Sequence, residues 1–162
     1  MDAGDEFYMR EALYEAEAAR AKGEVPIGAV VVREGSIIGR GHNSVIGSSD
    51  PSAHAEVIAL RAAAAARGNY RLSGAALYST VEPCAMCAGA IVHARISRLV
   101  YGALDSKAGV IESHLRFLQA DFLNHRVEAE GGVLEHLCRE MLQSFFREKR
   151  KTGSDAERCE SG

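Results

Sequence analysis

Cys84 and Cys87 lie three residues apart, directly after Pro83. Their sulfur atoms could together bind a metal ion. Residues three apart in a helix face the same side, so both sulfurs would point in one direction. The free N–H groups and partial positive charge of a helix N-terminus favour thiolates, the form of cysteine that binds zinc. Pro83 suits such a helix start because proline has no N–H to leave unpaired. By itself this motif fits a redox centre or a structural zinc site as well as a catalytic one.

His54 and Glu56 narrow those alternatives. Both follow the turn formers Asp50-Pro51-Ser52, at the predicted start of another helix. One imidazole and two thiolates would give zinc three protein ligands and leave its fourth position open for water, as in catalytic sites. Glu56 lies close enough to His54 in the chain to exchange a proton with that water without binding the metal. The pattern therefore predicts His54, Cys84 and Cys87 as zinc ligands and Glu56 as the catalytic residue, and sulfur and nitrogen ligands favour zinc.

Apolar periodicity and turn formers predict the elements that would position these residues. Helices are predicted at 6–22, 52–67, 84–94, around 115–120 and after Gly132, and strands at 27–32, 36–39, 75–80, 98–103 and 126–129. The helix at 84–94 is apolar or small almost all round, which predicts that it is buried. A hairpin followed by alternating helices and strands indicates an α/β fold, with a mixed sheet and helices on both faces.

The composition is that of one globular domain: 162 residues, 47% hydrophobic and 25% charged. We expect this domain to span 1–151 and the polar segment 152–162 to be a disordered tail. The acidic N-terminus lacks an apolar run, so no secretory signal or membrane span is predicted, and a cytoplasmic location is expected. The four cysteines, including Cys138 in an apolar helical pattern and Cys159 in the tail, do not resemble a disulfide framework.

The net charge and the glycine pattern bear on whether the protein binds nucleic acid or a nucleotide cofactor. The net charge of −3 argues against a uniformly basic nucleic-acid surface, although a local basic patch would still be compatible with it. Gly39-Arg40-Gly41 lacks the third glycine of a dinucleotide-binding fingerprint, and the sequence contains no P-loop. No nucleotide cofactor is therefore expected.

His54-Ala55-Glu56 followed by Pro83-Cys84-Ala85-Met86-Cys87 is the signature of zinc-dependent deaminases. Over about residues 6–151, the sequence further resembles the bacterial tRNA-specific adenosine deaminases. The segments that carry this resemblance are Val25-Pro26-Ile27-Gly28-Ala29-Val30, Asn43, Asp50-Pro51-Ser52-Ala53-His54-Ala55-Glu56, Asn69-Tyr70-Arg71-Leu72, Glu82-Pro83-Cys84-Ala85-Met86-Cys87-Ala88-Gly89-Ala90 and Phe145-Phe146-Arg147. The resemblance implies a three-layer α/β/α fold around a five-stranded mixed sheet, a homodimer and one zinc ion per subunit. It also implies hydrolytic conversion of the wobble adenosine of an arginine tRNA to inosine.

The same resemblance implies a set of substrate contacts. The flipped adenine would enter a pocket lined by Ile27, Asn43 and Ala55. RNA contacts are expected from Asp105 and Lys107 in one loop, from Phe146 by stacking, and from Arg147, Lys149 and Arg150 at the basic end of the last helix.

Other readings of these features stay open. The basic helix end can be read simply as cations that favour a helix C-terminus. The sequence departs from the family pattern at Leu104, where a basic residue is usual, and at Ala108, which replaces a hydroxyl residue, so one phosphate contact is either missing or supplied elsewhere.

Two alternatives to the tRNA reading remain. The first keeps the zinc chemistry and changes the substrate to a free base or nucleotide: guanine, cytidine or deoxycytidylate. The second is a zinc-stabilised RNA-binding module without enzymatic activity. Glu56 discriminates against the second, because binding alone has no use for a carboxylate beside an open metal position.

Overall fold

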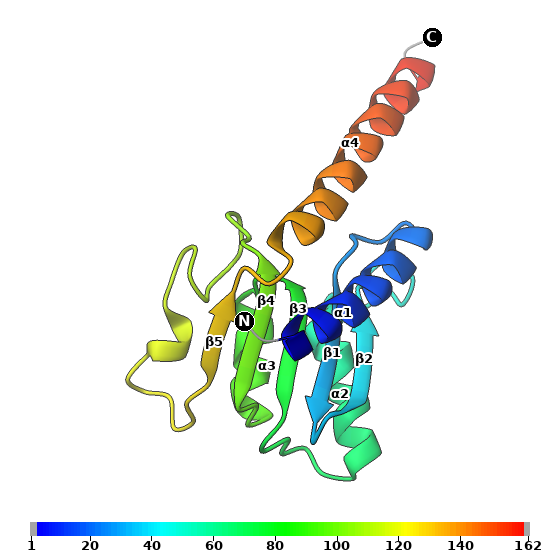
Figure 1. The fold of residues 1–162 in the computed structure, drawn as a ribbon. Helices are drawn as coiled ribbons and strands as arrows, with labels where there is room; N and C mark the ends of the chain where they lie inside the picture. Colours follow the sequence, from blue (N-terminus) through cyan, green and yellow to red (C-terminus); the bar gives the residue numbers. More distant parts are fainter. Residues whose placement is uncertain (1–2, 161–162) are drawn as a thin grey trace.

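An open five-stranded sheet forms the centre of the molecule, with the strand order β2-β1-β3-β4-β5 (Figure 1). The computed structural model describes residues 3–160, and the side chains of 3–153. Its elements are α1 (Ala3–Ala21), β1 (Gly28–Arg33), β2 (Ser36–His42), α2 (Ala55–Arg67), β3 (Ala76–Val81), α3 (Ala85–His93), β4 (Arg98–Ala103), the 3-10 helix η1 (Phe117–Gln119), β5 (Glu128–Gly131) and α4 (Glu135–Glu160). β1 pairs antiparallel with β2 and β3, whereas β3, β4 and β5 run parallel. The predicted mixed sheet is confirmed.

Helices cover both faces of this sheet, as predicted. Because neighbouring strand residues point to opposite faces, Val30 joins the apolar cluster that includes Met9 of α1 and Cys138 of α4. Val31 joins the cluster on the other face, which includes Leu60 of α2 and Ile91 of α3. The result is the predicted three-layer α/β/α arrangement, with α2 and α3 side by side on one face (Figure 1).

Two glycines of β2 seat α2 closely against the sheet. A side-chain carbon on Gly39 would lie 2.4 Å from the Ala59 carbonyl oxygen, and one on Gly41 would lie 2.5 Å from the Ala55 carbonyl oxygen. Only glycine permits this approach of helix backbone to strand. The Gly39-Arg40-Gly41 pattern thus has a packing role, and it fixes the helix whose first turn carries Glu56.

Element bounds differ from the expected ones by up to three residues, as at β5, which was expected at 126–129 and spans Glu128–Gly131, and two further expectations differ from the structure. The helix predicted at 84–94 is only half covered in the single chain: Cys87 and Ile91 are buried, but Met86 is 40% exposed and His93 is exposed. The exposed side of this helix also consists of small and apolar residues, so the sequence does not distinguish it from the buried side.

The segment expected to be a disordered tail continues α4 as far as Glu160. Adding residues to an existing helix costs much less than starting one, so a polar segment can extend it. The helix projects from the domain (Figure 1), and the side chain of Cys159 lies outside the described part. No helix among the described residues is long and apolar enough to cross a membrane.

Candidate metal centre

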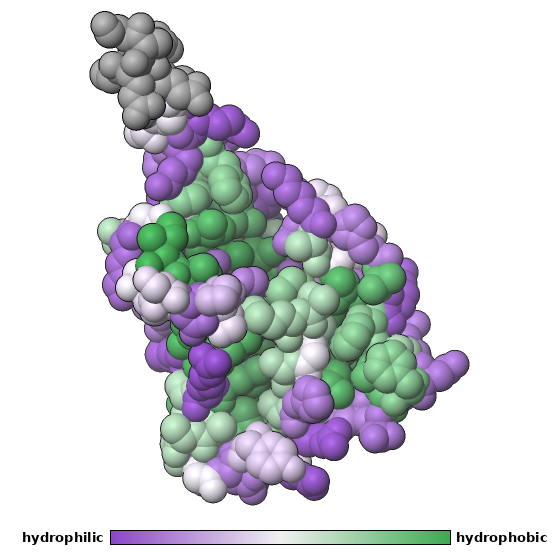
Figure 2. Space-filling view, turned by 180° about the vertical axis from the view of Figure 1, so that it is seen from behind, coloured by the Kyte–Doolittle hydropathy of each residue, from purple (hydrophilic) through white to green (hydrophobic). Residues whose placement is uncertain are grey.

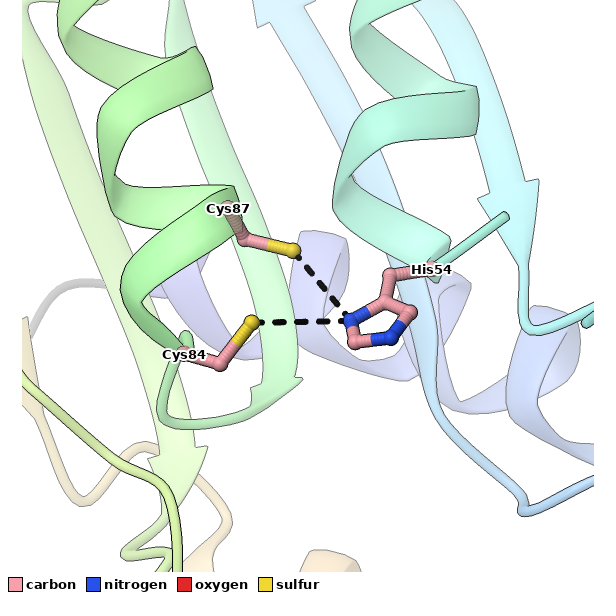
Figure 3. Close-up of side chains that lie close together, drawn as sticks. All are labelled: His54, Cys84 and Cys87. Atoms are coloured by element: carbon pink, nitrogen blue, oxygen red, sulfur yellow. Dashed lines mark hydrogen bonds between the residues drawn. The ribbon is translucent and has the colours of Figure 1, made fainter. Parts of the chain in front are cut away.

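Two helix N-termini bring the three predicted ligands together. His54 is the residue that precedes α2, Cys84 precedes α3, and Cys87 lies in the first turn of α3. His54 Nδ1 lies 3.6 Å from Cys84 Sγ and 3.5 Å from Cys87 Sγ, and all three side chains point into one space (Figure 3). Neither His54 nor Cys84 caps its own helix with its side chain, so both remain available as ligands.

These distances fit a zinc ion. Zinc–sulfur bonds of about 2.3 Å and zinc–nitrogen bonds of about 2.0–2.1 Å, at tetrahedral angles, place a sulfur and a nitrogen ligand about 3.6 Å apart. The ligand atoms of His54, Cys84 and Cys87 all lie within 4.8 Å of one another. Sulfur and nitrogen donors favour zinc over calcium or magnesium. The site can therefore hold zinc with three protein ligands, and one tetrahedral position is left for a small molecule.

Each of the two cysteines shifts the pKa of the other. A hydrogen bond from the Cys87 thiol lowers the pKa of Cys84 to about 5. The same bond, together with burial, raises the pKa of Cys87. One thiolate therefore exists at neutral pH, and a metal ion must displace the proton of the second.

Glu56 lies beside this centre, and its side chain is almost fully buried, at 4% exposed. The Ser79 hydroxyl on β3 donates to Glu56 Oε1 at 2.8 Å, and it lies at the same distance from the Val81 carbonyl oxygen. Burial raises the pKa of Glu56, while hydrogen bonds with Cys87 and Ser79 act in the opposite direction. A carboxyl group that gains a proton readily beside a metal site suits a residue that takes up and returns protons.

The three predicted base-pocket residues lie near the first turn of α2. The Asn43 side-chain oxygen accepts a hydrogen bond from the Ala55 N–H at 2.9 Å, which satisfies a free donor of α2. This bond uses the acceptor side of the Asn43 amide and leaves its NH₂ group as a donor. The Ile27 carbonyl oxygen accepts from the Asn43 N–H, so the Ile27 segment is tied to the same place.

Most of the predicted RNA contacts line one groove of about 700 Å³ between α4 and the loop after β4. Its lining residues are Lys107, Gln143, Phe146, Arg147, Lys149 and Arg150. Phe146 is 44% exposed, whereas Phe145 is buried. Arg147 also donates to Glu140 across the surface of α4.

Asp105 does not line this groove. Its carboxylate accepts from the backbone N–H groups of Lys107 and Ala108, so it shapes the loop from within. Leu104, which replaces a basic residue of the family pattern, is 49% exposed.

The sequence reasoning missed two residues that hold this region in place. Ser79 orients Glu56, and Glu82 accepts hydrogen bonds from the loop after β4. Both are buried polar residues at the end of an otherwise apolar strand, which is the signal that could have revealed them.

Comparisons with known proteins agree with this geometry. Residues 2–103 match the family described as the cytidine and deoxycytidylate deaminase zinc-binding region. A tRNA-specific adenosine deaminase of Bacillus subtilis (strain 168) is 50% identical over 147 residues, which cover 91% of each chain. Another, from Haemophilus influenzae, is 51% identical over 148 residues, covering 91% of this chain and 86% of the relative.

Solved structures show the same relationship. A structure from studies of A-to-I editing by tRNA:A34 deaminases at the wobble position of transfer RNA is 46% identical, with a TM-score of 0.82, and the match covers 84% of this chain and 99% of the other. A guanine deaminase of Bacillus subtilis is 42% identical with a TM-score of 0.59, over 64% and 66% of the two chains. Together with the zinc-binding geometry, these matches show that the chain belongs to the cytidine and deoxycytidylate deaminase family, and within it to the tRNA-specific adenosine deaminases.

Proposed function

We propose that this protein is a zinc-dependent hydrolase that converts the wobble adenosine in the anticodon loop of arginine tRNA to inosine. One observation carries the chemical part: a three-ligand metal centre lies next to the buried carboxylate of Glu56. The substrate part is supported by the similarity to tRNA-specific adenosine deaminases over nine-tenths of the chain.

The reaction consumes one water molecule and releases ammonia. When bound, zinc supplies Lewis-acid activation of the attacking water. Glu56 accepts one proton from that water and passes it to the ring nitrogen of adenine, and then takes the second proton, from the hydroxyl group added to the ring carbon, and passes it to the leaving amine. Ser79 keeps the Glu56 carboxylate in place by the 2.8 Å hydrogen bond to Oε1. The backbone N–H groups of the first turn of α3, the helix that follows Cys84, would stabilise negative charge that develops on the oxygen.

Base recognition is assigned to Ile27 and Asn43, whereas Ala55, whose side chain is fully buried, contributes by holding the Asn43 oxygen with its N–H. Because the Asn43 oxygen is bound by the Ala55 N–H, its NH₂ group is the part that donates to an acceptor on the purine. An anticodon loop is already single-stranded, so turning one base out of it costs little compared with opening a duplex.

RNA binding is assigned to the groove between α4 and the loop after β4. Its cations, Lys107, Arg147, Lys149 and Arg150, would contact phosphates, and exposed Phe146 would stack on a base or shape the loop. These positive charges lie together on a chain whose net charge is −3, so they form a local patch. We place Asp105 in this site as a residue that shapes the loop around Lys107.

We also propose a homodimer formed through α2 and α3, in the cytoplasm where tRNA is found. The outer surface of these helices carries an apolar hollow lined by Val57, Leu60, Arg61, Ala64, Tyr70, Ala90, His93 and Ala94. Figure 2 shows this face, on which apolar residues gather between polar rims. Gly89 and Ala90 are half-exposed on it, and small residues permit a second copy to approach closely.

The specificity for arginine tRNA can be tested by incubating the purified protein with a set of tRNA transcripts that all carry adenosine at the wobble position. We expect inosine in the arginine tRNA and little in the others. Equal conversion throughout the set would contradict the specificity, and conversion of none would contradict the tRNA substrate. Turnover of guanine would instead favour the second candidate, which rests on the similarity to a guanine deaminase over about two thirds of the chain.

A further inference from the structure

The side chain of Glu82 organises residues 104–113 of the segment between β4 and η1, here called the 104–113 loop. Glu82 directly follows β3, and it is only 2% exposed. Its Oε1 accepts from the Asp105 N–H at 3.0 Å and from the Ser113 hydroxyl. Its Oε2 accepts from the N–H groups of Ile111, Glu112 and Ser113 at 2.7–3.0 Å. One carboxylate therefore holds both ends of the loop.

The shape of the loop around this carboxylate allows no side chain at Gly109. A carbon added there would lie 2.3 Å from both Cδ and Oε1 of Glu82. The neighbouring Val110 N–H donates to the carbonyl oxygen of Pro83, the residue just before the metal ligand Cys84. The loop is thus anchored to the same short segment that begins the metal-binding helix.

The loop carries Lys107, one of the cations that line the groove beside α4, here called the basic groove. Lys107 is exposed at the tip, where Asp105 closes a turn by accepting from the Lys107 and Ala108 N–H groups. Asp105 is in turn fixed by the hydrogen bond from its own N–H to Glu82. A chain of contacts therefore runs from Glu82 through Asp105 to the backbone of Lys107.

We propose that Glu82 is a positioning residue for RNA: it sets the place of Lys107 relative to the metal centre, so that the anticodon loop is held with its base over the zinc site. This inference rests on the proposed function, because it takes RNA as the molecule that Lys107 contacts. The hydrogen bonds named above to the Glu82 carboxylate all come from residues 105–113, so its effect on RNA would pass through this loop.

The variant Glu82→Gln separates the two ends of the loop. Its NH₂ group would replace Oε1, where it can donate to the Ser113 hydroxyl but faces the Asp105 N–H. The other oxygen would keep the three N–H groups of 111–113. The substitution therefore releases mainly the end that holds Lys107, and it leaves the 111–113 end in place.

A double-mutant cycle between Glu82 and Lys107 tests the proposal, with deamination of a tRNA anticodon stem-loop as the assay. Losing a buried charge-assisted hydrogen bond is worth about tenfold in an equilibrium, so we expect Glu82→Gln to raise KM by about that factor while kcat and zinc content stay near wild type. Lys107→Ala should raise KM in the wild type and have little further effect in the Glu82→Gln background, because residues that act through one another are not additive. Equal effects of Lys107→Ala in both backgrounds, or an unchanged KM in Glu82→Gln, would overturn the proposal.

Asp5→Asn is the matched control. Asp5 is as buried as Glu82, at 1% exposed, and it lies far from the 104–113 loop in the chain; its carboxylate accepts from Tyr78 and Arg98. The Asp5→Asn substitution should destabilise the protein without changing KM. If it raises KM as much as Glu82→Gln does, the effect of Glu82→Gln on KM comes from lost stability and not from RNA positioning.

Hydrogen exchange separates failure of this inference from failure of the proposed function. In Glu82→Gln, the Asp105 amide should lose protection while the strand amides of β3 and β4 keep theirs. If the wild type converts no stem-loop, the proposed function has failed, and RNA positioning fails with it even if the Asp105 amide responds. If the wild type is active and the Asp105 amide does not respond, the role of Glu82 alone is contradicted.

Discussion

His54 and Cys84 occupy equivalent positions on two neighbouring helices. Each is the last extended residue before its helix, α2 or α3, and His54 Nδ1 lies 3.6 Å from Cys84 Sγ. The positive ends of both helices therefore converge on the site where two thiolates must be stabilised. The fold thus supplies part of the electrostatic environment that the metal centre requires, independently of the ligands themselves.

Removal of one ligand should release the metal. We expect Cys84→Ser to lose most of its zinc and its activity, because a hydroxyl group is a poor zinc ligand compared with a thiolate. Cys138→Ala serves as a control, since Cys138 is a buried cysteine on the other face of the sheet. Metal content of the purified variants decides the outcome: full zinc occupancy in Cys84→Ser would contradict the ligand assignment.

Glu56→Gln should separate binding from chemistry. The amide keeps the shape of the side chain but cannot accept the proton of the attacking water, so kcat should fall by about 10²–10⁴-fold. Zinc content and affinity for the anticodon stem-loop should remain close to wild type. Rapid-quench measurement of single turnovers checks this, and near-normal turnover by the variant would exclude Glu56 as the proton shuttle.

The basic groove predicts a salt dependence of RNA binding. Each phosphate contact to single-stranded RNA adds about 0.7 to the slope of log affinity against log salt, so Lys149→Ala with Arg150→Ala should reduce that slope by about 1.4. Arg33→Ala with Arg67→Ala removes the same charge from a surface between β2 and the end of α2, and it should leave the slope unchanged. If both pairs behave alike, the helix end has only a general electrostatic effect.

If the protein dimerises through the apolar face of α2 and α3, one charged side chain introduced there should prevent dimer formation. Ala90→Arg would bury a cation in the proposed interface, whereas Ala62→Arg adds the same charge at an exposed position of α2 outside the apolar hollow. Light scattering should give the mass of two chains for the wild type and for Ala62→Arg, and of one chain for Ala90→Arg. A single-chain mass for the wild type would rule the dimer out.

Much of the fold was predictable because its elements are strongly patterned. The β4 strand spans 98–103 as predicted, and the hairpin of β1 and β2 follows from β-branched residues around Glu34-Gly35. The cluster of His54, Cys84 and Cys87 was predictable because histidine and cysteine are uncommon and their spacing is distinctive.

The contacts that hold the site together were less accessible from sequence. The bond between Asn43 and Ala55 and the anchoring of the 104–113 loop by Glu82 join residues far apart in the chain, and no periodicity indicates such pairs. The exposed face of α3 was missed for a related reason. Small residues such as Gly89 and Ala90 are compatible with a core and with an interface between chains alike.

This zinc centre should deaminate adenosine within RNA. The most direct test is to incubate the zinc-loaded protein with an arginine-tRNA anticodon stem-loop and, in parallel, with guanine, cytidine and deoxycytidylate, and to measure inosine and released ammonia. We expect inosine at the wobble position and no ammonia from the free base or nucleotides. Turnover of a free base or nucleotide with the stem-loop untouched would contradict the substrate, and no turnover by protein that holds one zinc per chain would contradict the enzymatic function itself.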